Sequence, residues 1–416
     1  MSQQTKACVA IFTMAVVVRL ICLALWMPKL NPDVDMDSYH SLARNLAAGK
    51  GFVAIAPDGR ELPNVGRTPL YPLFLAGLIK SGGDRLGVFL AVQCMLWGAI
   101  CLLTTLLAAR WLPWNGAVAA GLLVAFDPNA VMRGLDLRTE TLFTLLLLAG
   151  TCVLAWRNQR PWGWLWTGVL WSLTSLCRPI GVWLWVVVLI LAIIWRARAA
   201  WLAMFLVGFL PLIGLWTARN AAVTGQWFFS TNATDNLLES WAAGVEAKQQ
   251  GVDVAIVQKE LQARVGTVEF FDNRESFEHR LQESRRSSRQ ILLSAPLLTL
   301  REAALGWGKL LLGPGQRTLE PSLRQSQPPS RWWPPLYSIA LVGVLILSVV
   351  GLWKLGRSAL LPGILLLYFV ALAGGPVSYS RYRVPITPLL ALLAVAGAWD
   401  SREPRSQDPP TTKVAG

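Results

Sequence analysis

The sequence predicts an all-helical, polytopic membrane protein, a bundle of about ten (roughly 10–12) hydrophobic transmembrane helices. Of the 416 residues, 54% are hydrophobic and only 15% are charged, whereas soluble domains carry about 25% charged residues. Apolar runs recur along the chain, and a run of about 20 residues matches the ~30 Å hydrocarbon core of a bilayer. The 21 Trp residues cluster near the ends of these runs, as aromatic belts do at head-group level. Because backbone polar groups in lipid must be satisfied within their own segment, these runs are expected to be helices.

The apolar runs that are expected to span the membrane are ten in number. An even number of spans places both termini on one side, and basic residues are denser in the short loops of that side, which favours cytoplasmic termini. Two large polar regions then lie outside, at 29–86 and 219–335. The expected spans are 8–28, 87–109, 116–131, 141–156, 162–177, 180–195, 199–218, 336–353, 358–375 and 384–399.

The first outside region is expected to hold a short interfacial helix at 37–51. Apolar residues recur there at helical spacing, and Asp37 or Ser38 is the expected N-cap. The run 69–79 is expected to lie along the membrane or to dip into it. If that run spanned the membrane instead, every later loop would change sides.

The second outside region is expected to be largely helical. Its charged middle, 245–290, has helical character, and 291–313 reads as an interfacial helix, with an eleventh span as the alternative. Residues 1–399 therefore form one membrane domain, and the polar tail 400–416 is expected to be disordered and cytoplasmic.

Several kinds of chemistry are poorly supported by the sequence. The six cysteines form no CxxC pair, and the chain has only two histidines, so no zinc site can be identified. A Walker loop, a usable GxGxxG and an HExxH motif are also absent. A transporter would more often carry acids or polar breaks in mid-span. Here the polar residues gather at one rim of the bundle, which suits an enzyme that works at the membrane surface.

Acidic and basic residues at that rim are the candidates for function. Asp33, Asp35 and Asp37 stand at alternate positions in NPDVDMDSY. Either they belong to a solvated loop with a helix cap, or one of them is a catalytic carboxylate. Glu140 opens a span, either as an acid favoured by the helix dipole or as a functional group. Arginines at outside span ends could bind a phosphate bidentately or extend toward the lipid surface. They are Arg67, Arg178, Arg219, Arg381 and Arg383.

Short motifs recur in a recognisable order along the chain. They are DMDSYHSLARNLAAGKGF, GRTPLYPLFLAGL, LRTETLF, CRPIG, WTARNAAVTGQWF and SRYRVPITPLLALLA. Their order resembles the GT-C class of membrane glycosyltransferases, from about residue 10 to residue 399. The most similar branch is the bacterial relatives of dolichyl-phosphate-mannose–protein mannosyltransferases, a glycosyltransferase family 39-like group that includes the aminoarabinose transferases of lipid A.

This resemblance implies a reaction and a location. The chain would take a sugar from a polyprenyl-phosphate carrier and pass it, with inversion, to an acceptor lipid, protein or glycan. It would work in a bacterial plasma (inner) membrane with its active site facing the periplasm or exterior. Its partners would be that donor, the acceptor and membrane lipids, and no nucleic acid.

The resemblance also implies roles for individual residues. The catalytic acid of the family lies four residues before a Tyr, which is Asp35 here, with Asp37 as its neighbour. Asp35 would act as the general base, and Glu140 would orient the sugar or hold an arginine. No metal is demanded, although a divalent cation is used by some members of the wider class. The substrate- or phosphate-binding set would be Arg67, Tyr71, Arg178, Arg219, Asn220, Arg381 and Arg383.

Two other classes of function stay open at this stage. A carrier or flippase for lipid-linked sugars would use the same arginines without covalent chemistry. An inactive structural subunit of an envelope-polysaccharide complex would keep the bundle alone. The apolar mid-span sequence speaks against the carrier, and the retained Asp35 and Glu140 speak against the inactive subunit.

Overall fold

The computed structural model describes residues 2–29, 38–56, 58–315 and 332–399. It confirms the expected fold class, because the chain is a polytopic helical membrane protein. The single sheet in the described part is a two-stranded hairpin. Three parts of the predicted architecture lie outside the described residues: the aspartates at 33, 35 and 37, residues 316–331 of the second outside region, and the tail 400–416.

The apolar part of the molecule is a bundle in which an apolar helix stands at each predicted span. Its members are α1 (Gln3–Trp26), α4 (Leu86–Ala108), α5 (Trp114–Phe126), α7 (Glu140–Arg157), α8 (Pro161–Cys177), α9 (Leu184–Ile194), α10 (Ala199–Thr224), α16 (Trp333–Leu355), α17 (Leu360–Ala373) and α18 (Thr387–Ala398). Five described stretches are long and apolar enough to cross a membrane, namely α1, α4, α7, α10 and Trp333–Ala373. The crossing by the shorter helices remains a prediction.

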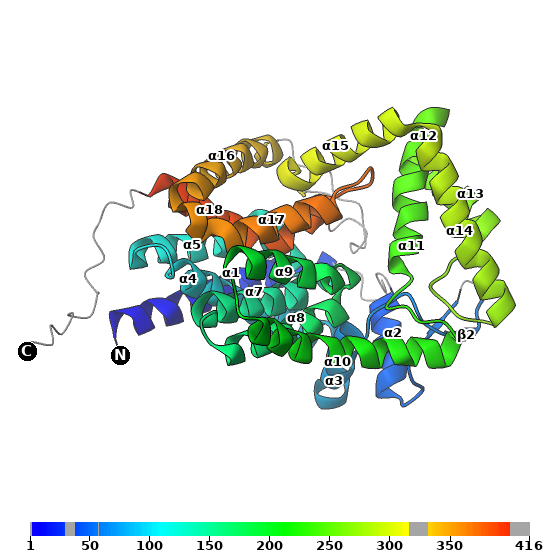
Figure 1. Ribbon diagram of the computed structural model, residues 1–416, viewed down its shortest axis with the longest axis horizontal. Coiled ribbons are helices and arrows are strands. Elements are labelled where there is room, and N and C mark those ends of the chain that lie inside the picture. The colour runs from blue at the N-terminus through cyan, green and yellow to red at the C-terminus, as the bar shows by residue number, and fades with distance from the viewer. Residues whose placement is uncertain (1, 30–37, 57, 316–331, 400–416) are drawn as a thin grey trace, which may run out of the picture.

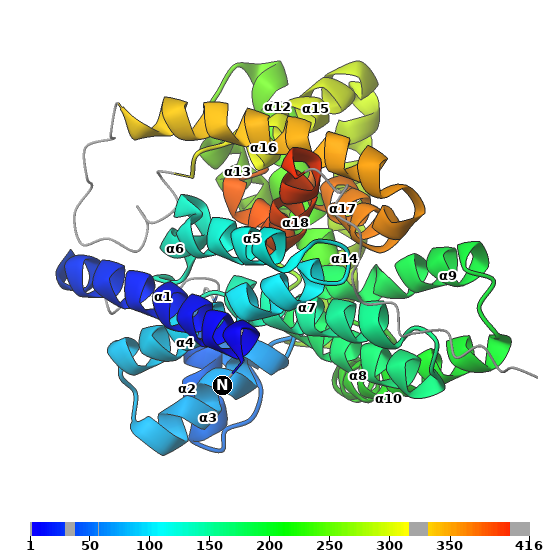
Figure 2. The ribbon, with the colours of Figure 1, turned by 90° about the vertical axis from the view of Figure 1, so that its left-hand side faces the viewer.

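Helix α18 lies at the centre of the bundle. All residues from Thr387 to Gly397 are buried, and Figure 2 shows α5, α16 and α17 around the helix. Helix α16 packs on it closely, because a Cβ on Gly351 would lie 2.0 Å from Leu393 O. Such small-residue contacts let helix backbones approach each other in membranes. Helix α1 begins and α18 ends at the same end of the molecule (Figure 1), as an even number of spans requires.

A buried arginine donates hydrogen bonds to the last carbonyl groups of one helix inside the bundle. Arg19 of α1 donates from Nη1 to Ala125 O at 3.1 Å and from Nη2 to Val124 O at 3.3 Å, at the end of α5. Its guanidinium also lies 4.8 Å from the ring centroid of Trp97. The last carbonyls of a helix lack partners within that helix. Arg19 therefore satisfies groups that would otherwise be stranded in a medium of low dielectric.

The polar end of the molecule combines short helices with one hairpin. The strands β1 (Val53–Ile55) and β2 (Glu61–Pro63) are antiparallel, with Ala54 opposite Leu62. Helix α14 leads into α15, which covers most of the predicted interfacial segment 291–313. We call α11–α14 the cap, and it stands at the right in Figure 1. The remaining elements are α2 (Tyr39–Ala47), α3 (Leu70–Gly82), α6 (Pro128–Arg133), α11 (Asn232–Asn236), the π-helical turn η4 (Leu237–Ala242), α12 (Ala243–Gln250), α13 (Val254–Val265), α14 (Arg274–Ser294) and α15 (Pro296–Leu312).

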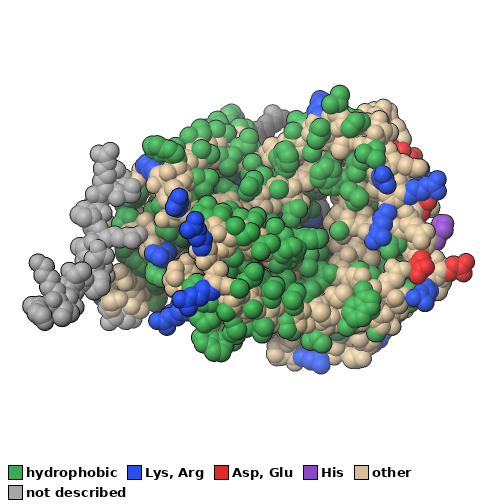
Figure 3. Space-filling model, viewed as in Figure 1, with side chains coloured by type: hydrophobic (Ala, Val, Ile, Leu, Met, Phe, Trp, Pro, Cys, Tyr) green, Lys and Arg blue, Asp and Glu red, His purple; other side chains and the backbone are tan. Residues whose placement is uncertain are grey.

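The surface shows how this architecture meets a membrane. On the face drawn in Figure 3, apolar side chains cover the middle, and charged side chains gather toward the two ends. The end near the chain termini carries Lys and Arg, whereas the cap end carries both signs. The face is also hollowed at the border between the apolar middle and the cap. A bilayer around the apolar middle would leave the cap in water.

Candidate functional site

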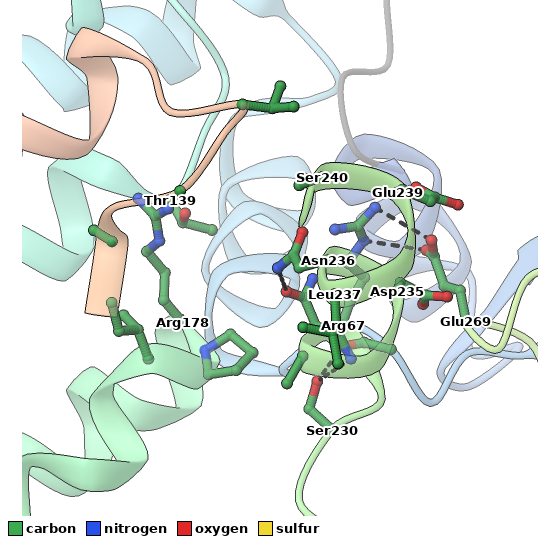
Figure 4. Close-up of a pocket in the computed structure, with 18 of the residues that line it drawn as sticks. Arg67, Thr139, Arg178, Ser230, Asp235, Asn236, Leu237, Glu239, Ser240 and Glu269 are labelled. Carbon is green, nitrogen blue, oxygen red and sulfur yellow. Dashed lines mark hydrogen bonds and ion pairs between the residues drawn. The ribbon is translucent and has the colours of Figure 1, made fainter. Parts of the chain in front are cut away.

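A cavity of about 830 Å³ lies between the bundle and the cap. Its walls come from the start of α2, the start of α7, the 3-10 turn η3 (Pro179–Trp183) after α8, the turn η4, and the segment 372–382 that links α17 to α18. Figure 4 shows Arg178 on one side of this cavity and Arg67, Glu239 and Glu269 on the other. The cavity therefore has two ends of different composition, which we call the bundle end and the cap end.

Three of the site residues predicted from the sequence lie together at the bundle end of the cavity. Glu140 is the first residue of α7, and its Oε1 lies 3.0 Å from Nη1 of Arg178 and 4.0 Å from Nε of Arg381. The Glu140 side chain is only 3% exposed, and no described group bonds its Oε2. The Tyr382 ring lies 5.7 Å from the Arg178 guanidinium and 5.0 Å from that of Arg381. An isolated carboxylate at this depth would be costly, and the two arginines offset that cost.

A second buried acid stands just before α7. Asp136 accepts from Nη1 of Arg133 at 2.9 Å and lies 2.8 Å from Nε of Arg138. The backbone carbonyl of Asp136 accepts from Gln93 at 3.0 Å. This group fixes the chain that leads to Glu140. Sequence reasoning missed Asp136, although an acid between two arginines beside an apolar run was a visible signal.

The cap end is rich in carboxylates. Arg67 donates from Nε and Nη2 to the two carboxylate oxygens of Glu269, at 3.1 and 3.2 Å. Asn64 donates to the same Glu269 at 2.8 Å. Asp235 and Glu239 lie four residues apart where α11 runs into the π turn, and both line the cavity. Sequence reasoning gave these three acids no role, because they belong to a charged segment with no motif around them.

Burial changes the protonation of the cap end. It raises the pKa of Asp235 to about 7, and the Glu239 and Glu269 carboxylates add to this rise. The Val268 N–H, 3.3 Å from Asp235 Oδ1, and the Arg67 charge oppose it. Burial, with Glu269 beside it, likewise raises the pKa of Glu239. The cap end therefore gains negative charge as the pH rises through neutrality.

Replacing Asp235 by asparagine should stabilise the protein more at pH 8 than at pH 5. The unfolded carboxyl ionises near its ordinary pKa of 3.8, whereas the folded one resists ionisation until about 7. The parent chain therefore loses stability as the pH rises between these values, and the full penalty is present above 7. We expect a gain of at least about 1 kcal/mol at pH 8. Thermal unfolding in detergent at both pH values would measure it.

The matched control for this prediction is Asp253→Asn. Asp253 is an exposed N-cap of α13 in the same cap, and an asparagine can also accept from the Ala255 N–H. Its substitution should shift stability equally at both pH values. Parallel pH dependence of the Asp235→Asn variant and the parent chain would contradict the role assigned to Asp235.

Four predicted residues are not among the side chains that line the cavity. Arg219 donates to Asn64 O at 2.8 Å and to Phe52 O at 3.3 Å. Asn220 donates to Phe228 O and Phe229 O at 3.2 and 3.0 Å. Tyr71 is buried with its ring against Tyr39 at a centroid distance of 5.3 Å. Arg383 donates to Leu310 O, Leu311 O and Gly313 O. These side chains hold backbone segments and rings around the site.

The predicted catalytic aspartates, Asp35 and Asp37, lie outside the described residues. Ser38 and Tyr39, which follow them directly, line the cavity. Ser38 occupies the predicted N-cap position of α2 with φ of +61°, and its side chain makes no capping bond. A non-glycine residue in this left-handed region is uncommon and is often found at functional sites. Among the described residues, no cluster of His, Cys, Asp and Glu is arranged to hold a metal ion.

One wall of the cavity is a segment clamped between helices. We call residues 374–380 the wall segment. A Cβ on Gly374 would lie 1.8 Å from Trp307 Nε1, and one on Gly375 would lie 2.8 Å from Trp241. A Cβ on Gly306 of α15 would lie 1.8 Å from Gly375 O. Only glycine therefore fits at Gly374 and Gly375, where the wall segment meets Trp307 and Trp241. The wall segment leads directly to Arg381.

A Gly306→Ala variant should unfold at a lower temperature than the parent chain. The added methyl group meets the Gly375 carbonyl, and overpacking of this kind typically costs about 1–3 kcal/mol. Gly308→Ala, two residues along α15, is the matched control, because nothing lies within 4 Å of its added Cβ. That control should be neutral or stabilising, since alanine favours helix. Equal melting temperatures for the two variants would contradict the clamped wall.

No protein-family model and no curated protein matches the chain, but solved structures do. The oligosaccharyltransferase AglB from Archaeoglobus fulgidus, in complex with an inhibitory peptide and a dolichol-phosphate, aligns over 94% of this chain and 50% of its own. Its TM-score is 0.52 at 12% identity. An oligosaccharyltransferase from the same organism, in complex with zinc and sulfate, aligns over 93% of this chain and 48% of its own, with a TM-score of 0.53 at 13% identity. The chain thus spans about half the length of AglB.

A bacterial structure was also found. ArnT from Cupriavidus metallidurans, bound to undecaprenyl phosphate, aligns over 92% of this chain and 77% of its own, at 14% identity and a TM-score of 0.42. That TM-score is too low to indicate a shared fold by itself. The alignment with AglB covers nearly the whole chain, and it confirms the GT-C fold that the sequence motifs implied.

Proposed function

We propose that this chain is a glycosyltransferase that moves a sugar from a polyprenyl-phosphate carrier to an acceptor at the outer face of a bacterial plasma membrane. The observation that carries the proposal is the cavity in which Glu140, Arg178 and Arg381 meet at the membrane-facing end. Ser38 and Tyr39, which come directly after Asp37 in the chain, line the same cavity. A GT-C fold provides the frame, and AglB with its dolichol-phosphate provides a structural parallel.

The phosphate of the donor fits the bundle end. As the glycosidic bond breaks, negative charge develops on the phosphate oxygen that leaves. Arg178 and Arg381 line the cavity, where they could stabilise that charge. The buried surroundings strengthen the electrostatic interaction between the guanidinium groups and the phosphate. Glu140 holds Arg178 in place, and its unbonded Oε2 is free to accept a sugar hydroxyl.

The lipid chain of the donor fits the edge of the cavity at η3. Ile180, Val182 and Trp183 line the cavity there, and Trp183 is 53% exposed. Figure 3 shows a surface hollow at the border between the apolar middle and the cap. An isoprenoid could therefore stay in lipid while its phosphate reaches the arginines. The acceptor would enter from the cap side.

The base in this reaction would be Asp35. It would take the proton from the acceptor hydroxyl or amine as that group attacks the anomeric carbon, with inversion. Three peptide units separate its Cα from that of Ser38, a reach of at most about 11 Å. Ser38 and Tyr39 both line the cavity. A reach of this length supports the choice of Asp35 as the base.

A transfer assay on the purified protein in nanodiscs would test this proposal. It would offer a panel of polyprenyl-phosphate sugars and follow the release of polyprenyl phosphate. Release from at least one donor, lost in an Arg381→Met variant and kept in Lys6→Met at the opposite end of the molecule, would support the proposal. Binding of lipid-linked sugar without release from any donor would favour the carrier function instead.

A further inference from the structure

A second cavity, of about 630 Å³, lies on the other side of the wall segment. Pro376, Val377 and Ser378 line it from that segment, and Val377 and Ser378 also line the first cavity. Helices α12 and α15 form its other sides. None of the roles proposed above uses this cavity.

A buried carboxylate lines the second cavity. Glu302 of α15 is 3% exposed, and it lines the cavity. Among the described residues, the charged partner of its carboxylate is Arg301, whose Nη1 lies 3.6 Å from Oε1 and whose side chain is 70% exposed. That distance is too long for a hydrogen bond. A buried carboxylate without a good partner is costly, so a cationic donor that entered the cavity would be bound favourably.

Two lysines line the same cavity. Lys248 of α12 and Lys309 of α15 both belong to its lining, and both are exposed. Lys309 stands seven residues after Glu302, so the two side chains lie on the same face of the helix. The cavity therefore presents a buried negative group with positive groups toward its opening. This arrangement complements a ligand that carries an ammonium group and a phosphate close together.

The cavity also lies beside the start of an apolar helix, α16. Gly313, Pro314 and Gly315 line one of its ends. The start of α16 adjoins this end, because Ser338 Oγ donates to Leu312 O at 3.0 Å. The first two turns of α16 expose Leu336 and Ile339, at 67% and 68%. Acyl chains could follow this apolar surface while a head group occupies the cavity.

We propose that the second cavity binds a phospholipid with a zwitterionic phosphoethanolamine head group. The ammonium group would donate to Glu302, and the phosphate would pair with Lys309 and Lys248. A choline head group has no N–H to donate, and a glycerol head group has no positive charge. The site should therefore prefer phosphatidylethanolamine over both. This inference stands independently of the proposed transfer reaction.

Native mass spectrometry of the protein in nanodiscs would test the preference. The host lipid is phosphatidylcholine, with a few per cent of either phosphatidylethanolamine or phosphatidylglycerol as the probe. The parent chain should retain phosphatidylethanolamine preferentially. Glu302→Gln should lower that retention by about tenfold, because the ammonium group would lose its hydrogen bond to a charged acceptor, and tenfold corresponds to about 1.4 kcal/mol. Glu275→Gln, an exposed acid in the first turn of α14, is the matched control and should change nothing.

A second variant protects the test against a simple loss of folding. Lys309→Gln should weaken the retention of both probe lipids while the preference for ethanolamine persists. Equal retention of the two probes by the parent chain would overturn the proposal, as would an unchanged preference in Glu302→Gln. Equally tight binding of free phosphoethanolamine, without acyl chains, would overturn the assignment to a lipid.

Discussion

An Arg178→Met variant should lose sugar transfer almost completely and should also be less stable than the parent chain. Transfer should fall by about 10²–10³, as when one donor that stabilises developing charge is removed from an active site. Stability should fall by about 3–5 kcal/mol, because Glu140 would remain buried without its partner at 3.0 Å. Transfer of labelled sugar and thermal unfolding in detergent would measure the two effects.

A double variant separates the two effects. Arg178→Met combined with Glu140→Gln removes both charges of the pair, so much of the stability should return. Transfer should not return, because the phosphate would still lack the guanidinium. An Arg178→Met variant that is as stable and as active as the parent chain would rule out both roles of Arg178. Full activity in the double variant would rule out its role toward the phosphate alone.

Exchanging Asp35 for asparagine should abolish transfer without changing stability. Asparagine keeps the shape of the side chain but cannot take a proton, and the help of a general base is typically worth about 10²–10⁴ in rate. The same assay would measure the loss, with the melting temperature as the check on folding. Asp37→Asn is the matched control and should keep most of the activity. Near-normal transfer by a well-folded Asp35→Asn variant would move the role to Asp37 or refute the mechanism.

The fold followed from the sequence because apolar runs of span length leave a chain few alternatives. The predicted span 87–109 and the helix Leu86–Ala108 differ by one residue at each end. The burial of α18 did not follow, because a helix that is apolar all round can face lipid or protein equally well. The cap arrangement also escaped prediction. Its helices are visible as charged periodic segments, but nothing in their sequence indicates which surface they cover.

The site was predictable where neighbouring spans bring their ends together. Glu140 opens α7 and Arg178 follows α8, and two consecutive antiparallel helices place these positions at one end of the bundle. The pairing of Arg67 with Glu269 joins residues 202 positions apart, so no local pattern could reveal it. Arg219 and Arg383 look like Arg178 in sequence, yet they bond backbone carbonyls. Residue type and position at a span end do not distinguish an arginine that lines the cavity from one that satisfies a carbonyl.

The central place of α18 has a consequence for how the protein is made. It follows all the other described helices in chain order, and yet its residues from Thr387 to Gly397 are enclosed by them. During synthesis the earlier helices enter the membrane first. They must therefore either leave the space for α18 open or rearrange when α18 is inserted. The wall segment and Arg381 directly precede α18 in the chain. The bundle end of the cavity is therefore completed only when α18 has joined the bundle, and a chain that stops before α18 would lack this part of the cavity wall.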